Sequence, residues 1–417
     1  MRVRRPWHEW IEPWYLSYAI IGLVVAGLVP VLIPLIVGET GNAGEVGLVV
    51  AAVSLGGLTS PFWGGLADHR RMHRWLLAGG MLITSVGLAA FTLINHPIIW
   101  FILAIIQGLG IASAATVANL FVVEAHPQGE WDERIGWLQT FYGIGQVAGL
   151  FLAGVLTRID LRVGFWVAAG LSAAAALLGW FTTKTPPVQT GLAPVLIHPV
   201  KDAESAISSP QRLFHRPDWK RIKNLGTLLN SSFGIFLLVW LIAFAGPAAV
   251  FSQYPLLMQK AYGITAGNSS IAFAIAAAIG LTLYSPAGKW SNRHGLVNIF
   301  RTSLGLRLLA FTGMLVLGFF PEGGFIGVPA LLTFGFVVLA WSLMSVSGTA
   351  LAARLSPVGE GLGLGIFNAL TAAASIIGAV LGGWVAGIWG YRSIVVFALA
   401  GVGLGLGLSY FLKWKEK

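Results

Sequence analysis

The sequence predicts an all-α integral membrane protein whose twelve transmembrane helices form two similar six-helix halves. Three observations predict this fold: the composition, the number and length of the apolar runs, and an internal repeat. Of the 417 residues, 56% are hydrophobic and only 10% are charged, too little polarity to cover a soluble globule. Every Asp, Glu and His lies outside the apolar runs or at their ends. We therefore expect the bilayer to surround most of the chain.

Twelve apolar runs are long enough to cross a bilayer, which takes about 20 helical residues. They are uninterrupted and often rich in Ala, Leu and Gly, unlike the short alternating strands of a β-barrel. The expected helices lie at 14–37, 44–67, 75–94, 98–121, 134–157, 163–182, 228–258, 268–290, 297–319, 327–354, 360–387 and 391–412.

We expect the first run to be a retained helix, because it is too long, and too rich in proline at its end, for a cleaved signal peptide. Pro30 and Pro34 in this run, and Pro247 in the seventh, interrupt backbone hydrogen bonding and predict kinks. We expect these kinks to serve gating. The ninth run contains Arg307, whose long stem is expected to carry its charge to the membrane interface. Anion binding is the alternative role for Arg307.

The positive charges predict the orientation. Of the 26 lysines and arginines, Arg158, Arg162, Lys260 and Arg392 fall in odd-numbered loops and Arg307 falls inside a run. All others lie at the termini or in even-numbered loops. The positive-inside rule then places both termini in the cytoplasm. The net charge of +10 is largely this topology signal, so we expect no nucleic-acid partner. The chain has no cysteine, which excludes disulfides and thiolate metal sites.

The longest polar stretch divides the runs into six and six. We expect four segments: an interfacial segment at 1–13, a first bundle at 14–183, a cytoplasmic linker at 184–226 and a second bundle at 227–417. Trp7, Trp10 and Trp14 recur at helical spacing beside arginines, which predicts that the first segment anchors on the inner leaflet.

The two halves are similar in sequence. At a shift of 229 residues, small residues of the fifth run match small residues of the eleventh, and polar residues match polar ones. The matched pairs are Gly136 and Gly365, Gln139 and Asn368, Gln146 and Ser375, Gly149 and Gly378, and Gly154 and Gly383. A duplication of six helices is the simplest explanation, and such repeats are typical of transporters.

A loop motif makes the resemblance specific. Between the second and third runs, Gly64 is followed by Asp68 and Arg70. This loop resembles the cytoplasmic loop signature of the major facilitator superfamily, and its second copy contains Gly288, Asn292, Arg293 and Gly295. The resemblance implies the fold of that family, alternating access, and loops that act as cytoplasmic gates. Ala104 replaces an arginine that the family often has, and the fifth run lacks the Gly-Pro pair of drug/proton antiporters, which argues against proton-driven antiport.

In the family, the first, fourth, seventh and tenth helices of the chain line a central cavity, with help from the second, fifth, eighth and eleventh. Their polar and aromatic residues are the candidate substrate-binding set, and each amide has the alternative role of a hydrogen bond between helices. Trp240 and Trp341 suggest an aromatic cavity, because Trp otherwise prefers interfaces. The candidates are Gln107, Gln139, Tyr142, Gln146, Trp240, Gln253, Tyr254, Trp341, Asn368 and Thr371.

We therefore expect a secondary transporter in the plasma membrane that exports a small amphipathic or weakly polar organic solute. It would be a monomer in contact with membrane lipids, and it would need no cofactor, metal or catalytic residue. Uncoupled facilitation and lipid translocation are alternatives, since no acid or histidine lies inside the runs. A membrane enzyme would need a cluster such as Asp68, His69 and His73, or Glu124, His126, Glu130 and Asp132. A transporter-like sensor is the remaining alternative.

Overall fold

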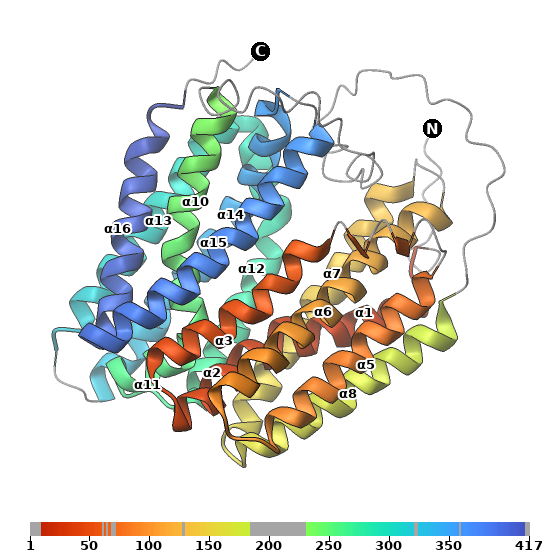
Figure 1. Ribbon diagram of the computed structural model, residues 1–417. Helices are drawn as coiled ribbons and strands as arrows, with labels where there is room; N and C mark the ends of the chain where they lie inside the picture. Colours follow the sequence, from red (N-terminus) through yellow and green to blue (C-terminus); the bar gives the residue numbers. More distant parts are fainter. Residues whose placement is uncertain are drawn as a thin grey trace.

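The computed structural model describes residues 10–60, 62–63, 66–67, 72–126, 130–183, 231–320, 324–357 and 360–412. Within these ranges the regular structure is entirely helical (Figure 1). The helices of the first half are α1 Tyr15–Gly22, η2 Leu23–Leu28, α2 Val29–Thr40, α3 Ala43–Leu55, η3 Gly56–Thr59, α5 His73–Phe91, α6 Pro97–Ala125, α7 Trp131–Leu156 and α8 Leu161–Thr182. Those of the second half are α10 Ser232–Ser252, α11 Tyr254–Tyr262, α12 Ala266–His294, α13 Leu296–Leu317, α14 Gly324–Leu355, α15 Glu360–Trp389 and α16 Arg392–Ser409.

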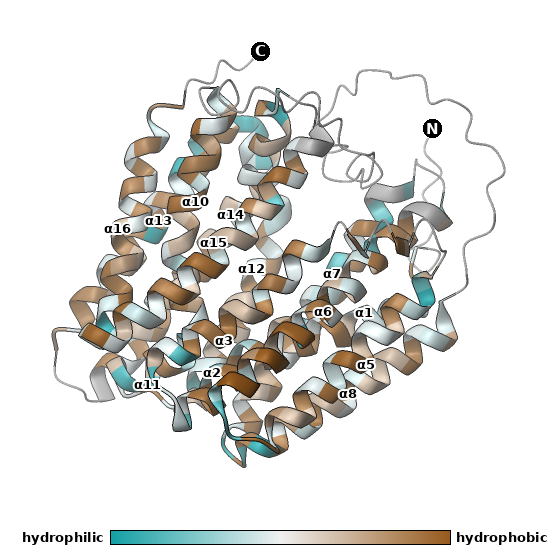
Figure 2. Cartoon of the chain, viewed as in Figure 1, coloured by the Kyte–Doolittle hydropathy of each residue, from teal (hydrophilic) through white to brown (hydrophobic). Residues whose placement is uncertain are grey.

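Eleven helices of the described residues are long and apolar enough to span a membrane, and Ala43–Thr59 is a shorter apolar helix. α1, η2 and α2 together make the first span. Figure 2 shows hydrophilic residues gathered near the helix ends. Large apolar side chains are exposed along the helices, with Val86 69% and Leu309 71% exposed, as expected where lipid covers the surface. The predicted fold class is confirmed.

The seventh run differs from the prediction in its course. The run expected at 228–258 is broken at Gln253, whose ψ of 9° lies outside the helical region, and α11 begins anew at Tyr254. Pro255 occupies the first turn of α11, where its missing N–H needs no partner. The predicted segments 1–13 and 184–226 lie mostly or wholly outside the described residues. Trp14 is buried against Phe121, so its side chain faces protein rather than lipid.

The two halves lean against each other at one end of the molecule (Figure 1). We call the end where α1 begins and α16 ends the terminal face, and the other end the opposite face. Near the opposite face, α3 packs on α15 and α7 packs on α12. A β-carbon at Gly383 would lie 2.5 Å from the carbonyl oxygen of Ala43, and one at Gly154 would lie 2.8 Å from that of Gly267.

Polar contacts also join the halves at the opposite face. The amide Nε2 of Gln253 donates to the carbonyl oxygen of Ala43 at 2.9 Å. Arg158 donates from Nη2 to Oδ1 of Asn268 at 2.6 Å. These bonds connect opposite halves, so they must break before the molecule can open at this face.

The repeat predicted from the sequence appears as equivalent packing within each half. Gly149 of α7 faces η2, where a β-carbon would lie 2.1 Å from the carbonyl oxygen of Leu23. Gly378 of α15 faces α10, where a β-carbon would lie 2.3 Å from that of Ala245. Glycine permits these close backbone approaches, which supply much of the packing energy between helices in lipid.

An ion-pair cluster ties the start of the first span to the fourth and fifth spans at the terminal face. Glu12 contacts Nε2 of His126 at 2.5 Å and Nη1 of Arg134 at 3.2 Å. Arg134 also pairs with Glu130 at 3.0 Å. Burial raises the pKa of Glu12, whereas the contacts with His126, Trp14 and Arg134 lower it. The lowering is the larger effect, so the pKa of Glu12 lies below its ordinary value of 4.5.

We expect Glu12→Gln to lower the free energy of unfolding by about 1 kcal/mol at neutral pH. Because the pKa of Glu12 is lower in the folded than in the unfolded protein, its contribution is present above pH 4.5 and lost as the pH falls further. Thermal unfolding of both proteins at several pH values measures this. A gap between them that persists at the lowest pH would contradict the assignment.

Candidate functional site

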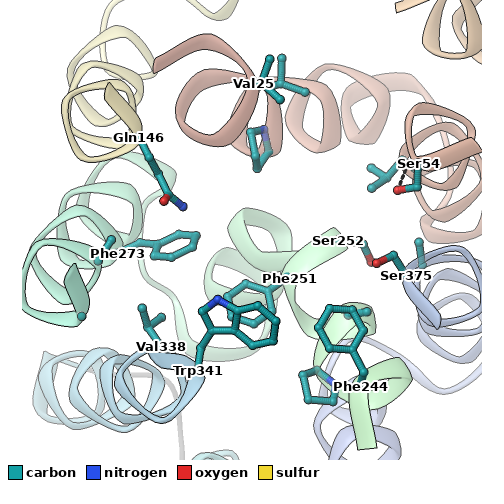
Figure 3. A pocket seen from close by; sticks show the side chains of 18 of the residues that line it. Val25, Ser54, Gln146, Phe244, Phe251, Ser252, Phe273, Val338, Trp341 and Ser375 are labelled. Carbon is teal, nitrogen blue, oxygen red and sulfur yellow. Dashed lines mark hydrogen bonds between the residues drawn. The ribbon is translucent and has the colours of Figure 1, made fainter. Parts of the chain in front are cut away.

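A cavity of about 400 Å³ lies between the two halves (Figure 3). Both halves contribute to its wall. The first half supplies Val25, Val29, Pro30, Ile33, Pro34, Val50, Val53, Ser54 and Gln146. The second half supplies Phe244, Pro247, Ala248, Phe251, Ser252, Phe273, Ala277, Gly280, Leu281, Tyr284, Arg307, Val338, Trp341, Ser342, Ser375 and Ala379.

The wall from the first half is mainly aliphatic. Its centre is the first span, where the π-helix η2 precedes Pro30. Proline has no N–H to donate to the carbonyl four residues earlier, so the regular α-helical bonding is interrupted there. Single π-helical turns of this kind are frequent at functional sites. Pro30 and Pro34 both face the cavity.

The second half supplies all the aromatic residues in the described wall of the cavity, which we call the aromatic wall. The rings of Phe244 and Trp341 are 5.4 Å apart, and those of Phe251 and Phe273 are 5.8 Å apart. Trp240 lies behind this wall with 1% of its surface exposed, and its indole donates to Oγ1 of Thr371 at 2.9 Å. Thr371 and Trp240 therefore support the aromatic wall rather than lining the cavity.

The neutral polar groups of the cavity come from several helices. Gln146 of α7 points into the cavity, with Ser54 and Ser375 across from it (Figure 3). The Ser375 hydroxyl donates to the carbonyl oxygen of Thr371 at 3.0 Å, and the Ser342 hydroxyl donates to that of Gly280 at 2.9 Å. The serines thus offer acceptor lone pairs, and the amide of Gln146 offers donors and an acceptor.

Other predicted residues lie on α7 and α15, nearer to the terminal face than the cavity wall is. Gln139 and Asn368 lie seven residues before Gln146 and Ser375, on the same helix faces, yet both are exposed. Gln139 donates to Oδ1 of Asn119 at 3.2 Å. Tyr142, one turn before Gln146, packs its ring 5.2 Å from that of Tyr18. These predicted residues lie on the way from the terminal face to the cavity.

Three other predicted residues are buried away from the cavity. Gln107 is fully buried, and its amide has no hydrogen-bond partner among the described residues. Gln253 joins the halves, and the Tyr254 hydroxyl donates to the carbonyl oxygen of Ser269 at 2.8 Å. Of the ten predicted residues, Gln146 and Trp341 contribute directly to the cavity wall.

Arg307 differs most from the prediction. Its side chain is 0% exposed and borders the cavity, so the expectation that it reaches the membrane interface is wrong. Its Cζ lies 5.3 Å from the ring centre of Trp341, and Nη1 donates to the sulfur of Met344 at 3.3 Å. The contacts with Trp341 and Met344 hold the guanidinium inside the second half instead. The sequence did indicate that Arg307 could be a site residue, because its charge lies inside an apolar run.

The predicted gate loops are described only in part. Gly64, Asp68 and Arg70 lie outside the described residues. In the second copy, Gly288, Asn292 and Arg293 belong to the last turns of α12. Gly295 has a φ of 87° between α12 and α13, a conformation that favours glycine. Gating by these loops stays a prediction.

The described residues give no support to a catalytic cluster. Among them, no group of three His, Cys, Asp or Glu side chains could hold a metal ion. His126 and Glu130 belong to the ion-pair cluster with Glu12 and Arg134, where they tie helices together.

Comparison with known proteins agrees with this architecture. Multidrug resistance protein 2 of Bacillus subtilis (strain 168) is 24% identical over 90% of this chain and 88% of its own length. Multidrug resistance protein MdtH of Proteus mirabilis (strain HI4320) is 24% identical over 63% of this chain and 57% of its length. The crystal structure of nucleoside transporter NupG superposes with a TM-score of 0.76 at 14% identity, covering 97% of this chain and 99% of that one. The profile of the Major Facilitator Superfamily matches residues 14–347. The chain therefore belongs to the major facilitator superfamily and is a membrane transporter, not an enzyme.

Proposed function

We propose that this transporter exports small amphipathic organic solutes across the plasma membrane by alternating access. The cavity carries the proposal. It lies between the two halves, its wall combines aliphatic, aromatic and neutral polar groups, and it is closed toward one face by contacts that join opposite halves. Apolar cavities with a few polar groups are typical sites for small organic ligands. The similarity to multidrug resistance proteins supports the same solute class.

The orientation follows from the charges. The basic residues of the sequence favour the terminal face as the cytoplasmic side. Because the contacts of Gln253 and Arg158 close the opposite face, this conformation would then take up a solute from the cytoplasm for export. Rocking of the halves about the cavity would separate Gln253 from Ala43 and Arg158 from Asn268, and would close the terminal face.

The cavity residues also bear on whether transport is coupled to a proton gradient. Among the described residues that line the cavity, none is an Asp, Glu or His, and intramembrane acids are the usual proton carriers of transporters. We therefore expect transport that is independent of a proton gradient.

Proteoliposomes test both parts of the proposal. They would be loaded with three poorly permeant naphthyl compounds: the neutral 2-naphthyl glucoside, the anion naphthalene-2-sulfonate and the cation 2-naphthyltrimethylammonium. We expect saturable movement of at least one, at the same rate with and without an imposed pH gradient. Failure of all three to move faster than in protein-free liposomes contradicts the proposed function. Accumulation driven by the pH gradient would instead direct attention to the acids Glu39, Glu45 and Glu124.

Pro247 in the seventh span is expected to serve the conformational change. Pro247 lies inside α10 and lines the cavity. Pro247→Ala restores the missing backbone donor and should straighten the helix. We expect the transport rate to change by roughly threefold or more at unchanged protein level, since such motions often limit the rate. The rate per purified molecule in proteoliposomes measures this, and an unchanged rate contradicts the gating role.

A further inference from the structure

The charges of the described helices of the second half are unbalanced at Arg307. From α10 to α16, the only acid within the helix bounds is Glu360, at the first residue of α15 on the terminal face. Among the described residues, no carboxylate lies within 4.0 Å of the Arg307 guanidinium. A full positive charge therefore lies beside the cavity without a counter-charge among the described residues.

The contacts of Arg307 compensate its charge poorly. A methionine sulfur is a weak acceptor, and the Nε of Arg307 has no hydrogen-bond partner among the described residues. The Trp341 ring at 5.3 Å adds a cation–π contact. These interactions are much weaker than the hydration that a buried guanidinium loses. The guanidinium can therefore bind an additional partner of negative charge, and such a partner would reach it from the cavity.

The rest of the cavity defines the shape of that partner. Phe244, Phe251, Phe273 and Trp341 offer ring faces and edges on the side where Arg307 lies. Gln146 of the first half offers a neutral amide that points into the cavity (Figure 3). No lining residue in the described part of the chain carries a negative charge that would repel an anion or form an ion pair with a cation.

We propose that Arg307 is the counter-charge for the substrate, so that this transporter prefers amphipathic organic anions with an aromatic or otherwise apolar body and one acidic group. The acidic group lies toward Arg307 and the apolar body lies against the aromatic wall. This inference rests on the proposed function and specifies the substrate class of the same cavity.

Binding of the three naphthyl compounds to the purified protein, measured by isothermal titration calorimetry in a non-ionic detergent, tests the proposal. The wild type is expected to bind naphthalene-2-sulfonate at least about tenfold more tightly than 2-naphthyltrimethylammonium, because only the anion pairs with Arg307. Equal or tighter binding of the cation overturns the proposal, whatever any variant does.

Variants then assign the preference to Arg307. Arg307→Gln is expected to weaken sulfonate binding by about thirtyfold or more, a far larger change than in glucoside binding. Arg307→Lys keeps the charge and should retain most of the sulfonate affinity. Arg301→Gln is the matched control, since Arg301 is on the same helix but donates to Ser409 and lies over Tyr410 instead. Its sulfonate affinity should equal that of the wild type.

The outcomes separate this inference from the proposed function. If folded Arg307→Gln, checked by its thermal unfolding, binds the sulfonate within about twofold of the wild type, the inference fails. The proposed function still stands in that case if proteoliposomes move any of the three compounds. If the wild type neither binds nor moves any of them, both fail.

Discussion

A disulfide between Gly44→Cys and Gly387→Cys is expected to abolish transport. The two glycines lie at the opposite face, on α3 and α15, which belong to different halves. A β-carbon at Gly387 would lie 4.0 Å from the backbone nitrogen of Gly44, close enough for the roughly 5.5 Å between α-carbons of a disulfide. The bond would hold the opposite face closed, so the solute could enter from the terminal face but could not leave on the other side.

The chain suits this experiment because it has no cysteine of its own. Transport in proteoliposomes should fall to the protein-free level after oxidation and return after treatment with a reductant. Each single-cysteine variant, treated with the same oxidant, is the control and should keep its activity. Cross-linking is followed by cutting a protease site inserted between the halves, after which only linked fragments stay together. Complete cross-linking with transport intact would rule out rocking about this face.

Gly145→Ala is expected to prevent stable folding. The added β-carbon would lie 1.8 Å from the carbonyl oxygen of Ala19, which belongs to the first span and cannot move aside as a side chain can. Overpacking typically costs about 1–3 kcal/mol, and backbone obstacles lie at the high end of that range. We expect little monodisperse protein after detergent extraction and a much lower midpoint of thermal unfolding in whatever remains.

The same helix supplies a matched control. Gly136 of α7 is exposed, and a β-carbon there would meet no atom within 4 Å. Gly136→Ala makes the same chemical change, yet it should be neutral or stabilise the helix by up to about 1 kcal/mol. Opposite effects of the two substitutions would show that close approach, rather than helix propensity, makes Gly145 necessary. Equal effects would contradict the packing described here.

Much of the fold could be predicted from the sequence because lipid constrains it strongly. The runs were predictable since a spanning segment must satisfy its backbone internally and be apolar along its length. The break at Gln253 was not, because α10 and α11 are both apolar and the chain turns through a single residue between them. The hydropathy of a segment indicates whether it lies in lipid or protein, but it does not indicate where the helix axis changes direction.

The site was harder to predict than the fold. Gln146 and its repeat equivalent Ser375 both line the cavity, because the duplication gives their helices equivalent places. Gln107 and Gln253 have the same amide chemistry but are buried between helices. Which face of a helix meets the cavity depends on how the helices are rotated, and apolar helices in lipid show no polar stripe to indicate it. Arg307 was noticed for its charge, but its surroundings came only from the structure.

The unequal walls of the cavity have a consequence for how a solute would cross the membrane. The aromatic rings and Arg307 belong to the second half, whereas the first half contributes mainly aliphatic surface, prolines and Gln146. A bound solute would therefore keep its contacts with the second half while the first half moves relative to it. Its affinity measured from either side of the membrane should then be similar, and substitutions in the first half should alter the speed of passage more than the choice of solute.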